Sequence, residues 1–150
     1  MVTLEQAIIY ACTKHEGQTD RGGNPYVLHL IQVMMNVETL KEKIVAVLHD
    51  VIEDTNTTAD DLYLAGFSEE IVKAVLALTK YEGETRISAA HRAAANRIAC
   101  AVKLADVAHN MDLSRLVVIT DKDVERQREY EQVKEILEEA KANHWHNFQH

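Results

Sequence analysis

The chain has 150 residues, a formal net charge of −8 and 47% apolar residues. This length is typical of one domain with a hydrophobic core, and we expect residues 1–150 to form a single domain. The acidic balance argues against nucleic acid or an anionic membrane surface as the main partner. It does not exclude a small phosphorylated ligand, because a bound cation and a few basic side chains can reverse the potential at one site.

Residues that break helices are scarce. The chain contains 5 Gly and 1 Pro, and no run of β-branched residues alternates with polar ones over the length of a strand. The sequence therefore predicts an all-α bundle of six or seven helices, or more. The stretches expected to be helical are 4–14, 25–36, 41–54, 58–66, 68–79, 98–113 and 121–143, with a helix-prone region before residue 98.

Local signals set several of the predicted boundaries. Thr3 with Gln6 and Thr39 with Glu42 have the spacing of capping boxes, which start helices. Asn24 precedes Pro25, the order expected of an N-cap followed by the first helical residue. The polar stretch 81–88 is predicted to be the most flexible loop of the chain.

The segment 41–54, KEKIVAVLHDVIED, is the centre of the sequence. Its apolar residues recur at the spacing of a buried helical stripe, so we expect one helix wrapped by its neighbours. Near its end stand four polar residues: His49, Asp50, Glu53 and Asp54. Their i, i+4 spacing predicts that they share one wedge of that helix. Three carboxylates and an imidazole in apolar surroundings need a positive partner, such as a divalent cation, but a solvated helix end is an equal alternative.

Two further residues could complete a metal site. His29 lies among apolar neighbours, where a histidine is more often a hydrogen-bonded core residue than a ligand. Asp106 lies in the middle of an apolar helical stretch, where a carboxylate is costly unless it is paired or bound to metal. Lys103, three residues earlier, offers the alternative of an internal ion pair, and Asn110 shares a helix face with Asp106.

At this point the motifs match a known family. They appear in the order HEGQ at 15–18, GNPY at 23–26 followed by His29, LHDVIEDT at 48–55, LTK at 78–80 and KLADVAHNM at 103–111. The sequence resembles the hydrolase half of RelA/SpoT-type alarmone enzymes and the small stand-alone alarmone hydrolases, within the HD-domain phosphohydrolases. The resemblance covers about residues 7–142 and leaves 143–150 as a tail.

The resemblance implies one divalent metal ion, typically Mn²⁺ in this family. Its implied ligands are His29, His49, Asp50 and Asp106. Spacing alone does not distinguish Mn²⁺ from Fe²⁺, Zn²⁺ or Mg²⁺. Glu53 and Asp54 are implied to orient and deprotonate the attacking water. The implied reaction removes pyrophosphate from the 3′ position of guanosine 3′,5′-bis(diphosphate), or ppGpp.

The resemblance carries over less completely to the substrate-binding residues. The positions that match are Arg21, Lys80, Asn110, Arg126 and Tyr130. For Arg126 and Tyr130, four residues apart in the last helix, a surface arginine above a packed tyrosine is an equal alternative. The chain departs from the alarmone hydrolases at Asp20 and Asp112, where those enzymes usually have basic residues. Because of these departures, the metal site carries over from the family, whereas the guanine-binding site does not.

Three readings of function therefore remain at the level of sequence. The first is a metal-dependent phosphohydrolase of ppGpp, and the second is the same chemistry on another nucleotide or small phosphate ester. The third, a non-catalytic ligand-binding domain, would have no need of Glu53 and Asp54. We expect a cytoplasmic protein, because no signal peptide is recognisable and neither Cys12 nor Cys100 belongs to a disulfide or zinc motif. Homo-oligomers are compatible with the sequence.

Overall fold

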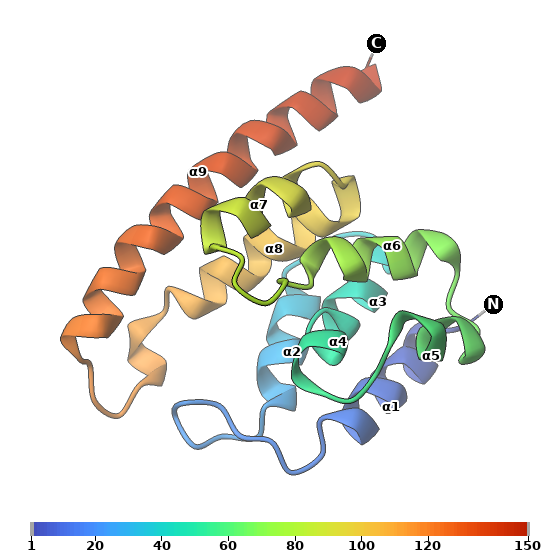
Figure 1. The fold of residues 1–150 in the computed structure, drawn as a ribbon, viewed down its shortest axis with the longest axis horizontal. Helices are drawn as coiled ribbons and strands as arrows, with labels where there is room; N and C mark the ends of the chain where they lie inside the picture. Colours follow the sequence, from blue (N-terminus) through green and yellow to red (C-terminus); the bar gives the residue numbers. More distant parts are fainter. Residues whose placement is uncertain (1, 150) are drawn as a thin grey trace.

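The computed structural model describes residues 2–149, apart from the side chains of 115 and 145–149. Within that part the chain is all α-helical, as predicted (Figure 1). The helices are α1 (Leu4–Lys14), α2 (Val27–Met35), α3 (Leu40–Leu48), α4 (Val51–Asp54), α5 (Ala59–Leu64), α6 (Glu69–Leu78), α7 (Arg86–Ala94), α8 (Arg97–Asn110) and α9 (Asp121–Gln149), with a 3₁₀ turn at Leu113–Arg115.

Two hydrophobic clusters hold the helices together. The first joins α1, α2, α3, α5 and α6 around large buried side chains such as Leu30, Leu48 and Leu62. The second joins α7, α8 and α9, and Leu137 of α9 is fully buried in it. Helix α8 contributes to both clusters, with Val102 in the first and Val107 in the second. The carboxylate of Asp106 is therefore presented at the junction of the two clusters.

The predicted capping boxes are confirmed. The Thr3 hydroxyl accepts from the Gln6 N–H while the Gln6 side chain accepts from the Thr3 N–H, and Thr39 and Glu42 do the same. A third box, at Thr58, starts α5. Each cap satisfies donors that the first turn of a helix leaves unpaired, so these starts depend on residues within one turn of each other.

The prediction of one helix over 41–54 is wrong. Helix α3 ends at Leu48, the chain turns at His49 and Asp50, and α4 follows as a separate short helix. The imidazole Nδ1 of His49 lies 2.6 Å from the Ala46 carbonyl oxygen, while the His49 N–H is 3.5 Å from the same oxygen. The side chain thus competes with the backbone for this carbonyl, which loosens the helix at that point.

The expected start of α2 is also corrected. Asn24 does not cap the helix, which begins at Val27 with Tyr26 as N-cap and no side-chain cap. The Asn24 N–H instead donates to the Asp20 side chain at 3.0 Å, so it belongs to the preceding loop. An isolated antiparallel bridge between Thr19 and Pro25 closes that loop.

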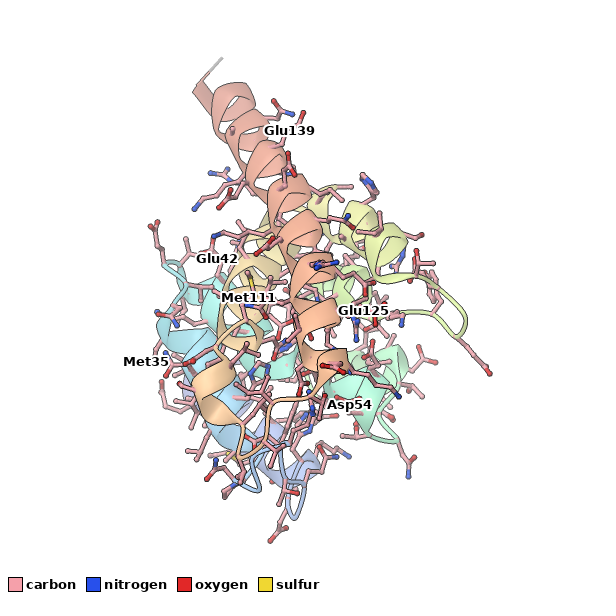
Figure 2. The ribbon with its side chains drawn as sticks, turned by 90° about the vertical axis from the view of Figure 1, so that its left-hand side faces the viewer. Met35, Glu42, Asp54, Met111, Glu125 and Glu139 are labelled. Carbon is pink, nitrogen blue, oxygen red and sulfur yellow. The ribbon has the colours of Figure 1, made fainter. Side chains whose placement is uncertain are left out.

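The ends of the C-terminal elements differ from the predicted boundaries. The polar loop is shorter than 81–88, because α7 already begins at Arg86. The predicted tail is helical, since α9 continues to Gln149, and His150 lies outside the described residues. Figure 2 shows the half of α9 that carries Glu139 extending beyond the other helices. The His144 ring nitrogen Nε2, 2.7 Å from the Ala94 carbonyl oxygen, ties this helix to the end of α7.

The remaining features of the fold concern membrane spans, the cysteines and an exposed methionine. Among residues 2–149 no helix combines the length and the apolar character that spanning a bilayer requires. Both cysteines are free thiols: Cys100 is buried, whereas Cys12 is exposed. Met35 is likewise exposed and projects from the edge of the molecule (Figure 2).

Candidate metal and active site

Three buried side chains from separate parts of the chain meet at the junction of the two clusters. His29 comes from α2, His49 from the turn between α3 and α4, and Asp106 from α8. One ligand-type atom of each lies within 4.8 Å of the others. Two imidazoles and a carboxylate at this separation form a donor set that suits a divalent transition-metal ion.

The distances show which atoms face one another. Asp106 Oδ1 lies 2.9 Å from His29 Nε2 and 3.4 Å from His49 Nε2, and Asp50 Oδ2 lies 3.0 Å from His49 Nε2. His49 Nε2 is buried, yet it makes no hydrogen bond of acceptable geometry with either carboxylate. A buried nitrogen in this position costs free energy unless its lone pair has a partner. The arrangement therefore fits a cation between the ring and the carboxylates.

The other nitrogen of each ring has a partner. His49 Nδ1 donates to the Ala46 carbonyl at 2.6 Å, and His29 Nδ1 lies 2.7 Å from His109 Nδ1. A neutral imidazole that carries its proton on Nδ1 offers its Nε2 lone pair as a ligand. Both rings can thus present Nε2 toward Asp106.

Asp106 is held from several sides. Its Oδ2 lies 2.9 Å from the Lys103 ammonium, and its Oδ1 accepts from the Asn110 amide at 3.1 Å. Burial alone would raise the pKa of Asp106, but Lys103, His29 and His49 outweigh burial and hold the pKa well below its usual range. The ion pair with Lys103 that the sequence offered as an alternative is present, and it coexists with the histidine contacts.

Asp50 is held by a neighbouring tyrosine. Its carboxylate accepts a hydrogen bond from the Tyr26 hydroxyl. Burial tends to raise the pKa of Asp50, but the neighbouring His49 lowers it overall, so the group is a carboxylate. Burial and the adjacent Asp50 charge together raise the pKa of Tyr26, which keeps the phenol protonated as a donor.

The expectation that four polar residues share one wedge is only partly met. The break at His49 turns that ring toward Asp106, whereas Asp50, Glu53 and Asp54 form a second group with oxygens within 4.8 Å. Glu53 and Asp54 are exposed. Partial burial raises the pKa of Asp54 to about 6, and the negative charges of Asp50 and Glu53 add to this effect. A carboxylate with such a pKa is ionised at neutral pH and is a better proton acceptor than an ordinary one.

A cavity of about 370 Å³ opens over these groups. Of the five predicted substrate residues, it is lined by Arg21, Asn110, Arg126 and Tyr130. Lys80 lines a separate neighbouring cavity of about 170 Å³ instead. The Lys80 N–H donates to Glu53 Oε1 at 2.7 Å, so the backbone of this residue contacts the acidic pair.

The lining of the larger cavity contains an ion pair that sequence reasoning missed. Arg21, in the loop before α2, pairs with the buried carboxylate of Asp123 at the start of α9. Arg126 lies 3.8 Å from the same carboxylate. The hydrogen bond from Arg21 and those from Thr120 hold the pKa of Asp123 far below its usual range. Asp123 thus draws together two arginines that are predicted to bind substrate.

Sequence reasoning assigned no site role to Tyr26, His109 or Asp123. For the first two, helical spacing carried a signal, because Tyr26 precedes His29 by three residues and His109 follows Asp106 by three. Asp123 gave no such signal. Its partner Arg21 is about 100 residues away in sequence, and its own position looked like an ordinary first-turn cap.

Comparison with known proteins adds sequence similarity to this geometry. No family model matches the chain. It is 33% identical over 125 residues to a GTP pyrophosphokinase of Myxococcus xanthus, and that match covers 72% of this chain and 16% of the relative. It is 37% identical over 125 residues to the bifunctional (p)ppGpp synthase/hydrolase SpoT of Escherichia coli, covering 72% of this chain and 17% of SpoT. The chain therefore spans about a sixth of the length of these relatives.

The fold has a counterpart among solved structures. The chain superposes on a metazoan SpoT orthologue, described as hydrolysing ppGpp, with a TM-score of 0.72, 20% sequence identity and 96% coverage of both chains. Fold and site together define an all-α domain with a buried histidine and aspartate group beside an acidic pair. The sequence and fold similarities confirm the resemblance to RelA/SpoT-type hydrolase domains.

Proposed function

We propose that this chain is a metal-dependent phosphohydrolase that removes pyrophosphate from the 3′ position of ppGpp. The observation that carries the proposal is the unbonded, buried Nε2 of His49 between the carboxylates of Asp50 and Asp106. The names of the relatives support the substrate, since SpoT is a (p)ppGpp synthase/hydrolase and a Vibrio cholerae protein, 36% identical over 86 residues, is a ppGpp 3′-pyrophosphohydrolase. That second match covers 53% of this chain and 12% of the relative.

The residues that would hold the ion are His29, His49, Asp50 and Asp106. Mixed imidazole and carboxylate ligation suits Mn²⁺, which we propose as the metal. When bound, such an ion supplies a Lewis acid that makes water more acidic and polarises a phosphoryl oxygen. Tyr26 and His109 would keep the carboxylate of Asp50 and the ring of His29 in place. Tyr26 donates to Asp50 Oδ2, and His109 contacts Nδ1, the nitrogen of His29 that does not face Asp106.

Glu53 and Asp54 would act on the attacking water. With its pKa of about 6, Asp54 is ionised at neutral pH and can take a proton from the water as the new P–O bond forms. Glu53, which accepts the Lys80 N–H, is held in one orientation and can position the water by a hydrogen bond. A domain that only bound nucleotides would have no use for this exposed acidic pair, and this argues against the non-catalytic reading.

The cavity would hold the nucleotide. Arg126 and Tyr130 are proposed to contact its phosphates, as the resemblance implies. Arg21 and Asn110, which line the same cavity, are also proposed to contact the nucleotide. Asp20 and Asp112, the two acidic residues that depart from the family pattern, each accept hydrogen bonds from nearby backbone N–H groups. They therefore argue less strongly against ppGpp as the substrate. Asp20 Oδ1 accepts the N–H groups of Gly22 and Asn24, and Asp112 Oδ1 accepts the N–H of Ser114 at 3.0 Å.

The proposal is tested by incubating Mn²⁺-loaded protein with ppGpp and measuring released pyrophosphate and GDP, with Asp50→Ala as the inactive control. Equal amounts of both products, absent in the control, are expected. No release from ppGpp together with phosphate release from another nucleotide would overturn the substrate and leave the phosphohydrolase class. If the protein still binds Mn²⁺ but releases neither pyrophosphate nor phosphate from any nucleotide tested, the proposal that it is an enzyme would be overturned. A cytoplasmic location and a possible homo-oligomer stay predictions.

A further inference from the structure

The two cavities next to the proposed metal site share part of their lining. The larger, of about 370 Å³, and the smaller, of about 170 Å³, share five lining residues: Asp50, Glu53, Lys103, Asn110 and Tyr130. These shared residues include a proposed metal ligand and one member of the acidic pair. A bond cleaved beside these shared residues can have one part of the substrate in each cavity.

The sizes of the cavities assign those parts. The 170 Å³ cavity lies between α6, α7, α8 and α9 and has less than half the volume of the other. A pyrophosphoryl group is much smaller than a nucleoside diphosphate, so it is the part that fits there. The rest of the substrate then occupies the larger cavity, which extends to Arg21 and Arg126.

The charges of the lining residues agree with this assignment. The smaller cavity is lined by three cationic residues, Lys80, Arg86 and Lys103, and by two acidic ones, Asp50 and Glu53. The larger cavity is lined by three cationic and seven acidic residues. Cations of both cavities have acidic partners, since Arg21 and Arg126 share Asp123, Lys103 pairs with Asp106 and Arg86 pairs with Glu129, so the comparison depends on the number of acidic residues in each lining. The smaller cavity is therefore the more favourable place for a concentrated negative charge.

Of the three cationic residues that line the smaller cavity, Arg86 is the one that lies in none of the sequence motifs. It is the first residue of α7, and its guanidinium lies 5.4 Å from the centre of the Tyr130 ring. Its Nη1 pairs with Glu129 of α9 at 3.0 Å, and both side chains are more than a third exposed. An exposed ion pair of this kind is weak and can exchange its carboxylate for a phosphate, which carries more charge and offers bidentate geometry.

We infer that the cavity beneath α7 binds the pyrophosphoryl group that is transferred to water, with Arg86 as a phosphate-binding residue and Glu129 as its resident counter-ion. The inference rests on the proposed function and goes beyond it by assigning each part of the substrate to a cavity. Water oxygen forms a bond to the phosphorus beside the shared residues, the bond from that phosphorus to the 3′ oxygen breaks, and the 3′ oxygen takes a proton. Pyrophosphate is left in the smaller cavity and the nucleoside diphosphate in the larger one.

The test measures binding of inorganic pyrophosphate directly, by calorimetric titration of Mn²⁺-loaded protein, so it does not depend on turnover. Arg86→Gln is expected to weaken pyrophosphate binding by about 10-fold or more, because it removes charge-assisted hydrogen bonds. Glu129→Gln is expected to strengthen it by up to about fivefold, because the counter-ion no longer competes. Binding of GDP to the same variants should change by less than about twofold.

Arg86→Lys keeps the charge and should restore part of the affinity, which separates phosphate binding from a loss of packing against Tyr130. The matched control is Arg128→Gln, since Arg128 is exposed on α9 and lines neither cavity. Unchanged pyrophosphate affinity in Arg86→Gln, or equal losses for pyrophosphate and GDP, would overturn the inference. A protein that binds pyrophosphate through Arg86 but does not hydrolyse ppGpp would refute the proposed function and, with it, the role of this cavity in the reaction, and would leave only a pyrophosphate-binding site.

Discussion

The imidazole rings of His29 and His109 stack with their centroids 5.0 Å apart, and their Nδ1 atoms lie 2.7 Å from each other. Two nitrogens at this distance must share one proton. His29 Nε2 faces Asp106 at 2.9 Å, so a metal bound at Nε2 requires the proton to stand on His29 Nδ1 and His109 to accept it. The contact thus provides an acceptor for the form of His29 that can serve as a ligand.

Removing this acceptor should weaken the metal site. We expect His109→Leu to lower Mn²⁺ affinity by about 10–100-fold, the usual cost of losing a partner that orients a ligand. His109→Gln keeps an acceptor and should lose less. Titration with Mn²⁺, followed by electron paramagnetic resonance of the free ion, measures both variants against His91→Gln, whose ring is exposed on α7. Wild-type affinity in His109→Leu would show that the contact does not orient His29.

Gln18 links the first loop to the acidic pair. Its amide donates to the Asp54 carbonyl at 3.0 Å, and its oxygen lies 2.8 Å from His15 Nδ1. Gln18→Leu frees the end of α4, and a displacement of about 1 Å of a reacting group can cost about 100-fold in rate. We therefore expect kcat on ppGpp to fall by about 10–100-fold with Mn²⁺ affinity unchanged. A parallel loss of metal would mean that Gln18 supports the whole site and not Asp54 alone.

Leu137 anchors the long last helix. Its side chain is fully buried in the cluster of α7, α8 and α9, and its carbonyl accepts from the Cys100 thiol at 3.3 Å. Leu137→Ala should lower the free energy of unfolding by about 2–5 kcal/mol, the range for buried leucines, as measured by urea denaturation. Leu64→Ala is the matched control, because Leu64 is 86% exposed and should change stability by less than about 0.5 kcal/mol. Equal effects would contradict the packing of α9.

The segment before α7 should be sensitive to acid. Arg92 pairs with Glu84 at 2.8 Å and also donates to the Thr79 carbonyl at 2.6 Å. The hydrogen bond from Arg92 and the Tyr81 N–H lower the pKa of Glu84 from 4.5 to about 2. A lowered folded-state pKa contributes stability that is complete above about pH 4.5 and is lost as the pH falls toward 2.

Arg92→Met removes the main cause of that shift. The difference in urea midpoint between wild type and this variant should be largest at pH 6 and should shrink steadily below pH 4.5. Amide exchange in residues 79–85 should rise in the variant at neutral pH. A difference that stays constant from pH 6 to pH 3 would show that Glu84 does not hold this segment.

Elements set by neighbouring residues could be predicted from the sequence. The boxes at Thr3 and Thr39 start their helices because both partners lie within one turn. The break at His49 could not be predicted in this way. It depends on an imidazole that bonds to the Ala46 carbonyl while facing Asp106, more than 50 residues further along the chain. Local helix propensity alone favoured an unbroken helix there.

The residues of the site also fall into those that the sequence pointed to and those that depend on contacts between distant segments. His29 and Asp106 stood out as polar residues in apolar stretches, and the motif resemblance brought them together before any geometry was known. The sharing of Asp123 by Arg21 and Arg126 is a contact between a loop and a distant helix start, and no local pattern encodes it. For the same reason the cavity beneath α7 was not foreseen.

Asp106 is proposed to bind the metal and Asp54 to accept a proton from water, and one paired measurement tests this division of roles. Bound Mn²⁺ per chain and pyrophosphate release from ppGpp are determined side by side for Asp106→Asn, Asp54→Asn and wild type. We predict that Asp106→Asn loses the metal and with it all turnover. Asp54→Asn should retain about one Mn²⁺ per chain and lose most turnover, by about 100-fold or more. Equal loss of metal in both variants, or full turnover in either, would contradict the account.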